Sequence, residues 1–173
     1  MTKKAIREMM LTKRDALSPD EVLKKSQALV QIIKASKLYQ NAQTVGLFYP
    51  MRNEIDLREL LHDHDKTFFF PKVEGHMLQF YEVDNQTAFA KSAFGVLEPM
   101  DAKPIDQSID YLIVPALAIS KDKHRIGYGK GFYDRYIESH PHAYTVGVIY
   151  DFQEIETMKA DAHDQALNDY IKI

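Results

Sequence analysis

The most constraining feature of this chain is a glycine-rich segment at residues 125–137, which reads Arg-Ile-Gly-Tyr-Gly-Lys-Gly-Phe-Tyr-Asp-Arg-Tyr-Ile. Three of the seven glycines of the chain, Gly127, Gly129 and Gly131, occupy alternate positions within it. Glycine has no Cβ and adopts positive φ readily, so successive backbone N–H groups in such a segment can close around an anion. The segment therefore predicts a phosphate-binding loop.

The residues on either side of this loop support an anion site. A buried-strand pattern, 111–117, precedes it, and residues 131–139 have the pattern of a helix. A strand, a glycine-rich turn and a helix N-terminus together bind phosphate through free N–H groups and the helix dipole, and Arg125 and Lys130 add positive charge. The spacing matches neither the dinucleotide fingerprint nor the P-loop, so a tight turn without a ligand stays open as the alternative.

Size and composition restrict the class of protein. With 173 residues, 45% of them hydrophobic, the chain is long enough for one well-buried domain, and we expect a single domain over 1–173. The formal net charge of −3 disfavours nucleic-acid binding, and the absence of cysteine excludes disulfides and a Cys nucleophile. The charged N-terminal residues lack the apolar core of a signal peptide, and no apolar run approaches membrane-spanning length. We expect a cytoplasmic monomer with no membrane or nucleic-acid partner.

Helical and strand patterns alternate along the chain. Helices are predicted over 3–16 and from Pro19 to about Ser36, the second capped by Ser18 with Glu21 three residues later. Buried strands are predicted at 44–50, 67–71, 77–81, 111–117 and 143–150, with Pro50 and Pro71 ending the first two. Residues 84–110 are interpreted as an irregular connection marked by Pro104. This order predicts a three-layer α/β/α fold with a mainly parallel central sheet.

Several polar side chains have both a structural and a functional interpretation. Lys3, Arg7 and Arg14 share one flank of the first helix, which is either a solvated basic face or a set of ligand contacts. Beyond the first strand, Asp56 is interpreted as a helix cap, whereas Glu54 is open between a surface carboxylate and a ligand contact.

The acidic and aromatic residues near the loop leave further alternatives. Asp134 follows the glycines where a helix dipole favours an acid, yet with Asp164 it is also placed to bind Mg²⁺ beside phosphates. Tyr128, between two glycines, is favoured as a ligand contact, while Phe132 and Tyr133 either stack on a planar ligand or belong to the core. No Gly-x-Ser-x-Gly elbow and no His-x-x-x-His pair is present, so neither a serine hydrolase nor a zinc site is indicated.

Four spaced motifs resemble the 5-formyltetrahydrofolate cyclo-ligase family, also called methenyltetrahydrofolate synthetase. They are Lys3-x-x-x-Arg7, Tyr49-Pro-x-x-x-Glu54, Gly95-x-x-Glu98-Pro99, and Asp110-x-x-Ile-Val-Pro115 leading to the glycine-rich segment. The resemblance implies an ATP- and Mg²⁺-dependent cyclisation of 5-formyltetrahydrofolate to 5,10-methenyltetrahydrofolate, with release of ADP and phosphate. In that chemistry the formyl oxygen is phosphorylated and N10 closes the ring, so no protein nucleophile is required.

The resemblance also implies a role for each matched residue. ATP would be bound by Lys3, Lys4, Arg7, Arg125, Ile126, Gly127, Tyr128, Gly129, Lys130, Gly131, Phe132 and Tyr133, with Arg125 and Lys130 acting catalytically beside the phosphates. The folate would contact Tyr49, Glu54, Tyr128, Gly129, Lys130, Gly131 and Phe132, and Mg²⁺ would be held by Asp134 and Asp164.

The chain departs from the family pattern just before the loop. Ser120 and Lys123 stand where the family usually has aspartate and glycine, and Asp122 is a candidate to replace the missing acid. Two rival functions remain at this level: a nucleotide- or folate-binding protein without turnover, and a sugar-phosphate isomerase-like enzyme with a similar layered fold.

Overall fold

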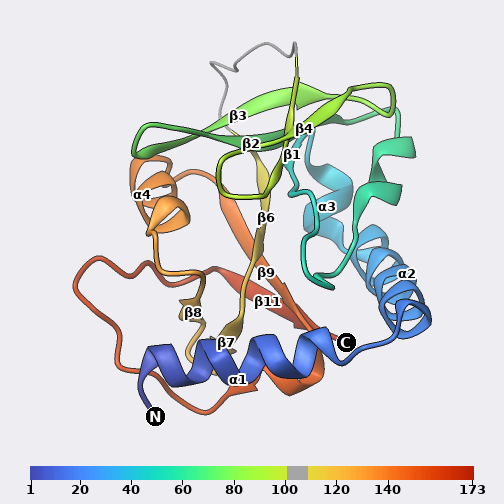
Figure 1. Ribbon diagram of the computed structural model, residues 1–173. Coiled ribbons are helices and arrows are strands. Elements are labelled where there is room, and N and C mark those ends of the chain that lie inside the picture. Colours follow the sequence, from blue (N-terminus) through green and yellow to red (C-terminus); the bar gives the residue numbers. More distant parts are fainter. Residues whose placement is uncertain (101–108) are drawn as a thin grey trace.

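The computed structural model describes residues 1–100 and 109–173 and is built on a six-stranded sheet (Figure 1). The strand order is β11-β9-β6-β1-β2-β3. The strands span Thr44–Gly46 (β1), Thr67–Glu74 (β2), Met77–Val83 (β3), Tyr111–Pro115 (β6), Tyr144–Ile149 (β9) and Asp169–Lys172 (β11). Neighbouring strands run parallel except β2 and β3, which confirms the predicted mainly parallel sheet.

Three helices begin and end close to their predicted bounds, whereas the short helix Lys37–Asn41 was not predicted. The helices span Lys3–Asp15 (α1), Pro19–Ala35 (α2), Lys37–Asn41 (α3) and Phe132–Ser139 (α4), with short 3-10 helices at Arg58–His62 (η1) and Asp151–Gln153 (η2). Ser18 Oγ accepts from the Glu21 N–H, and the Glu21 carboxylate accepts from the Ser18 N–H. This capping box confirms the predicted start of α2. Within the described part of the chain, no helix is long and apolar enough to cross a membrane.

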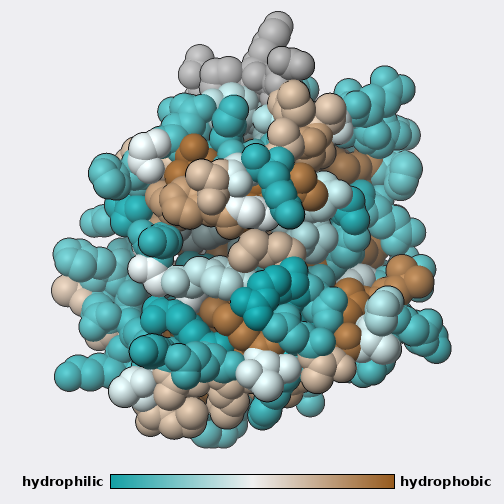
Figure 2. Space-filling model, in the orientation of Figure 1, coloured by the Kyte–Doolittle hydropathy of each residue, from teal (hydrophilic) through white to brown (hydrophobic). Residues whose placement is uncertain are grey.

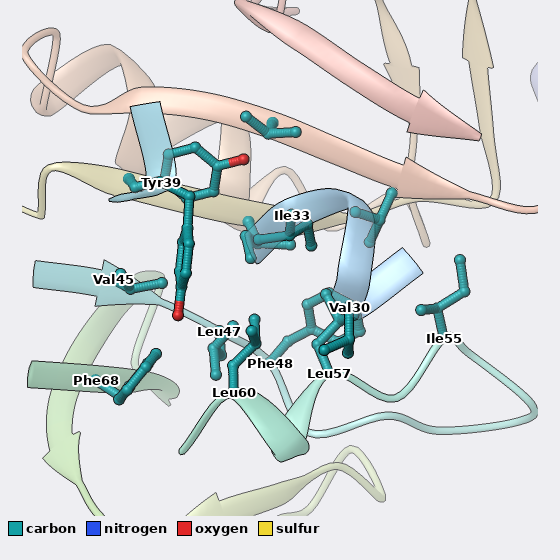
Figure 3. Close-up of a cluster of buried hydrophobic side chains, with 14 of the residues drawn as sticks. Val30, Ile33, Tyr39, Val45, Leu47, Phe48, Ile55, Leu57, Leu60 and Phe68 are labelled. Atoms are coloured by element: carbon teal, nitrogen blue, oxygen red, sulfur yellow. The ribbon is translucent and has the colours of Figure 1, made fainter. Parts of the chain in front are cut away.

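The sheet is covered on both faces, as the three-layer prediction requires. On one face α2 and α3 bury side chains such as Val30 and Ile33 against Val45 and Phe68 of the sheet (Figure 3). The other face is covered by α4 and by a small sheet, β10-β7-β8, made of Glu154–Ile155, Ala118–Ser120 and Arg125–Ile126. Helix α1 packs on this small sheet, so part of the third layer is β-structure (Figure 1).

The connections around β1 and β6 leave the sheet on opposite faces. The β1–β2 connection buries Leu57 and Leu60 on the α2 side. The β6–β9 connection instead buries Ile119 and Tyr136 on the α4 side. In open α/β sheets the carboxyl ends of strands at such a switch point frame a crevice where ligands bind.

Several predicted strand ends are wrong: β1 ends at Gly46 rather than at Pro50, and β3 continues to Val83. Strand β2 continues through Pro71 to Glu74, paired with β3. Its pairing with β1 ends at Phe69, so beyond that residue β1 no longer needs an N–H from β2, and a proline is tolerated at this edge. The strand predicted at 111–117 ends at Pro115, and the glycine-rich segment follows β8 of the β7–β8 hairpin rather than that strand.

Two other local predictions are corrected. Residues 84–110 are not wholly irregular, because Phe89–Lys91 (β4) and Leu97–Pro99 (β5) form a two-stranded sheet; Pro104 lies outside the described residues. Asp56 does not cap an α-helix: its carboxylate accepts from the N–H and guanidinium of Arg58, and η1 begins there with Leu57 at its cap position. Both elements are too short to show a helical or strand period in the sequence.

Candidate active site

A cavity of about 710 Å³ opens at the switch point, beyond the carboxyl ends of β1 and β6. Its walls come from the glycine-rich segment, the N-terminal turns of α1, the β4–β5 hairpin and residues 161 and 164. The face shown in Figure 2 is hollowed near its centre, with hydrophobic side chains gathered above the hollow and paler or hydrophilic ones below. The volume is that of a site for a small organic molecule.

The cavity brings together almost all of the site residues expected from the sequence. Those that line it are Lys3, Arg7, Tyr49, Glu54, Arg125, Ile126, Gly127, Tyr128, Gly129, Lys130, Gly131, Phe132, Tyr133, Asp134 and Asp164. Lys4 is the exception, because it is exposed on α1 and does not line the cavity.

The glycine-rich segment forms a loop that depends on positive backbone angles. Gly129 has φ 97° and Gly131 has φ 72°, and Gly131 is the cap residue from which α4 begins. Arg7 Nε donates to the Gly127 carbonyl at 2.8 Å, and a Cβ on Gly129 would lie 3.4 Å from the Arg7 guanidinium carbon. Helix α1 therefore packs closely against the loop, at a position where a side chain would strain the backbone.

Two arginines fix the ends of the loop. Arg125 Nε donates to the Pro115 carbonyl at 3.0 Å, and its guanidinium carbon lies 5.1 Å from the centre of the Tyr133 ring. Arg135 donates to the Lys130 carbonyl and to the His76 carbonyl, which ties the loop to the β2–β3 turn. Burial lowers the pKa of Arg125, and the nearby carboxylates oppose this shift. The loop thus holds a cation in poorly solvated surroundings, where it attracts anions strongly.

The inner end of the cavity contains a buried carboxylate. Glu54 is 7% exposed, and its Oε1 accepts from the Met51 N–H at 3.0 Å. Its Oε2 lies 3.8 Å from Nη1 of Arg14, which is 1% exposed. Burial raises the pKa of Glu54, whereas Arg14 and the Met51 N–H act to lower it. The surface interpretation of Glu54 is therefore wrong, and so is a solvated position for Arg14.

The outer end of the cavity contains a partly exposed charge cluster. Lys3 Nζ lies 2.7 Å from an oxygen of both Asp161 and Asp164. Burial raises the pKa of Asp164, but the bonds from Lys3 and from the Asp161 N–H outweigh it, so that the pKa lies below its usual value. Asp134 accepts from the Gln165 N–H, so its carboxylate lies beside the residue that follows Asp164.

These carboxylates fit a metal ion that arrives with a phosphate ligand. Mg²⁺ binds proteins through one or two carboxylates together with phosphate oxygens and waters, and Asp134 and Asp164 supply two in one wall. No group of three or more histidine, aspartate or glutamate side chains placed to hold a metal occurs in 1–100 or 109–173. The two carboxylates match the number that Mg²⁺ uses when phosphate oxygens and waters complete its coordination.

The β4–β5 hairpin supplies a wall that the sequence did not predict as part of the site. Phe94 faces Phe132 with ring centres 6.0 Å apart, and Lys130 Nζ lies 5.9 Å from the Phe94 ring. Glu98 is buried at 9% exposure, and its carboxylate accepts from the Val73 N–H at 2.8 Å. The Gly95-x-x-Glu98-Pro99 motif was the available signal, although it carried no assigned role.

The unusual residues before the loop keep the shape of the turn. Lys123 adopts φ 71°, the left-handed conformation that glycine would adopt with less strain. The Ser120 hydroxyl donates to the Asp122 carboxylate, so an acid does lie beside the position where the family usually has aspartate.

The fold and the cavity together define a class of protein. A parallel sheet with a deep site at its switch point, lined by a glycine-rich loop and buried charges, is typical of an enzyme that acts on small anionic molecules. The sequence model of the 5-formyltetrahydrofolate cyclo-ligase family matches residues 1–172, so the chain belongs to that family of enzymes.

Individual relatives agree with the family assignment. A Mycoplasma genitalium 5-formyltetrahydrofolate cyclo-ligase is 30% identical over 161 residues, which cover 89% of this chain and 88% of the relative. The mouse (Mus musculus) 5-formyltetrahydrofolate cyclo-ligase is 24% identical over 187 residues, covering 98% and 92%. The NMR structure of Aquifex aeolicus 5,10-methenyltetrahydrofolate synthetase superposes with a TM-score of 0.87 at 30% identity, covering 99% of this chain and 90% of that one.

Proposed function

We propose that this enzyme catalyses the ATP- and Mg²⁺-dependent cyclisation of 5-formyltetrahydrofolate to 5,10-methenyltetrahydrofolate, with release of ADP and phosphate. The observation that carries the proposal is one cavity that joins two groups of residues. A basic glycine-rich loop suited to a triphosphate lies in the same space as a buried carboxylate and apolar walls suited to a pterin.

The proposed reaction has two steps and uses no protein nucleophile. The formyl oxygen attacks the γ-phosphorus of ATP, the bond to the β-phosphate oxygen breaks, and ADP leaves. N10 then attacks the formyl carbon, the carbon–oxygen bond to phosphate breaks, the N10 proton is lost, and phosphate leaves. The enzyme must therefore align two substrates and stabilise the charge of the transferring phosphoryl group.

The cations of the cavity are assigned to the nucleotide. Arg125 and Lys130 on the loop, with Arg7 and Lys3 on α1, would neutralise the phosphate oxygens. The N–H groups of the loop, which glycine leaves accessible, would donate to the same oxygens. Asp134 and Asp164 would hold Mg²⁺, which would supply screening of the phosphate charge when bound.

The inner end and the apolar walls are assigned to the folate. Glu54 offers carboxylate oxygens, which only accept hydrogen bonds and so match the donor-rich edge of a pterin. Tyr49 contributes a ring whose hydroxyl is held at 2.6 Å by an Arg58 guanidinium nitrogen. Phe94 and Phe132 offer ring faces and edges for the remaining planar part of the folate.

The direct test mixes pure protein, 5-formyltetrahydrofolate, ATP and Mg²⁺ and follows the absorbance of methenyltetrahydrofolate. We expect product and ADP to form in equal amounts, and no product when ATP is omitted. Failure to form product would overturn the proposal. If calorimetry then shows that ATP and the folate still bind, the chain is a binding protein without turnover.

We also propose that the enzyme acts as a cytoplasmic monomer. Sedimentation at working concentrations should give the mass of a single chain, 20.0 kDa. A dimer with a concentration-dependent rate would contradict the monomeric state without affecting the proposed reaction.

A further inference from the structure

Arg14 is a buried cation that does not itself line the cavity, yet it reaches two residues that do. One guanidinium nitrogen lies 3.8 Å from Glu54 Oε2, and another donates to the Tyr128 hydroxyl at 2.6 Å. Its Nε donates to the Arg52 carbonyl at 2.8 Å. Three groups from two distant segments are therefore held by one planar side chain.

We propose that Arg14 is a positioning residue. It fixes Glu54, the carboxylate assigned to the folate, relative to the glycine-rich loop assigned to the nucleotide. This inference rests on the proposed function, because it deepens the roles given there to Glu54 and Tyr128. It predicts that a change at Arg14 disturbs the binding of both substrates, although the side chain contacts neither.

The turn that carries Glu54 needs such support. Arg52 and Asn53 have φ 47° and 62°, two consecutive non-glycine residues in the left-handed region, which persists only when neighbouring contacts enforce it. Arg14 Nε holds the Arg52 carbonyl, and Asn53 Nδ2 donates to the carbonyls of Arg14 and Leu17. On the other side, the Tyr150 hydroxyl donates to the Asn53 carbonyl. Helix α1 and the residues that follow it thus make most of the hydrogen bonds that hold this turn.

A guanidinium is the group that this geometry requires. Its donors point in fixed directions within a plane, so it can donate to a hydroxyl and a carbonyl while its charge lies beside a carboxylate. An ammonium in the same place is a point charge that cannot reach all three. Replacement by lysine should therefore retain the charge beside Glu54 but lose the geometry that joins it to Tyr128.

The charge of Arg14 also acts on the ionisation of Glu54. Arg125 also acts on this carboxylate, and the other titratable groups that face it are Tyr128, Tyr133 and Tyr150, whose pKa values are raised by burial and by the Glu54 charge. Burial raises the pKa of Glu54, while Arg14 and Arg125 lower it. Without Arg14 the carboxylate should take up its proton at higher pH than in the wild type.

The first experiment compares steady-state kinetics of Arg14→Lys and Tyr128→Phe with Lys13→Met, a control that removes a charge at an exposed neighbour on α1. We expect Arg14→Lys to raise the KM for both substrates about fivefold or more, and Lys13→Met to change neither by more than about twofold. Combining Arg14→Lys with Tyr128→Phe should add little to the larger single effect on the ATP KM, because both remove the same hydrogen bond.

A purely structural role would give a different result. Arg14→Lys would then lower the melting temperature while the folded enzyme kept both wild-type KM values, and this outcome would overturn the proposal. If the wild type itself makes no product, the proposed function fails. The inference is then decided by calorimetric titration of ATP and of 5-formyltetrahydrofolate into the same three variants.

The second experiment follows the pH dependence of the folate KM. In Arg14→Met the rise in KM on acidification should begin at higher pH than in the wild type, and an unmoved profile would contradict the electrostatic part of the inference. If Arg14→Met does not fold, two other variants replace it. Arg14→Lys should keep the wild-type pH profile, and Arg14→Met/Glu54→Gln should show no rise of the folate KM on acidification.

Discussion

The two charged ends of the cavity are built in opposite ways. At the inner end Arg14 and Glu54 are 1% and 7% exposed, and further hydrogen bonds from the chain hold them. At the outer end Lys3 and Asp161 keep 26% and 68% of their side-chain surface exposed. Removal of one partner from a buried pair leaves an uncompensated charge, whereas an exposed pair contributes little. The inner end therefore has a fixed geometry before any ligand arrives, and the outer end can exchange its partners.

This difference fits the two substrates proposed for the cavity. A pterin edge has to meet a carboxylate in one orientation, which a rigid buried group provides. A triphosphate with its metal ion replaces water and counter-ions when it binds. Lys3, which donates to two carboxylates, can then exchange these partners for phosphate oxygens. Asp161 and Asp164 are then the partners of Lys3 until phosphate oxygens replace them.

The largest effect expected from the comparison is on stability at the inner end. Arg14→Met should lower the free energy of unfolding by about 3 kcal/mol, because Glu54 is left buried and unpaired. Urea denaturation followed by circular dichroism measures it. Arg14→Met/Glu54→Gln should recover much of the loss, and a double variant as unstable as the single one would show that packing rather than charge dominates.

The next largest effect is on binding at the inner end. Glu54→Gln should raise the KM for 5-formyltetrahydrofolate about tenfold, roughly 1.4 kcal/mol, because an acceptor is replaced by a donor. The KM for ATP should change by less than about twofold. Equal effects on both substrates would remove the distinction between the two ends of the cavity.

Lys130 tests the loop that lies between the two ends. Lys130→Ala should lower turnover about tenfold, because a cation beside the transferring phosphoryl group is lost. Lys91→Ala, at an exposed position on β4, serves as the control and should keep wild-type turnover. Unchanged turnover in Lys130→Ala would place this lysine outside the phosphate site.

Asp134 tests the metal side of the outer end. Asp134→Asn should raise the Mg²⁺ concentration needed for half-maximal rate by about fivefold, because one carboxylate ligand becomes an amide. The rate at saturating Mg²⁺ should recover in part. A Mg²⁺ titration identical to that of the wild type would return Asp134 to a helix-dipole role.

The smallest effect is expected for the stability of the outer pair. Lys3→Met should change the free energy of unfolding by at most about 1 kcal/mol, since the pair is partly exposed. The pKa of Asp164 lies below the usual 3.8, so this contribution is present above pH 3.8 and is lost as the pH falls through the lowered value. Urea denaturation of wild type and Lys3→Met at neutral pH and below pH 3.8 checks both statements. A loss of unfolding free energy at neutral pH as large as that of Arg14→Met would contradict the difference between the inner and outer ends of the cavity.

Long elements with a clear period could be predicted from the sequence. The capping box at Ser18, the apolar strands and the glycine-rich segment each carry local information, and together they predicted the three longer helices and the mainly parallel sheet. Most of the cavity lining was instead implied by the resemblance to the cyclo-ligase family. The β4–β5 and β7–β8 hairpins were missed because strands of two or three residues have no measurable period.

The burial of single charged residues could not be predicted. Arg14 shares a helical flank with Lys3 and Arg7, and nothing in that spacing distinguishes a solvated arginine from one enclosed by a turn 38 residues away. For the same reason, the sequence could not decide whether Glu54 is a surface carboxylate or a ligand contact. Such burial depends on tertiary packing, which brings segments together from distant parts of the chain.

Helix α1 has a consequence for how the enzyme acquires its activity. The helix supplies Lys3, Arg7 and Arg14, but Lys3 bonds residues 158 and 161 positions later in the chain and Arg7 bonds one 120 positions later. Contacts between such distant residues form late in folding, because the intervening chain must first be ordered. Helix α1 therefore completes the cavity only after the segment up to Asp164 has been synthesised and folded, so the site is assembled late.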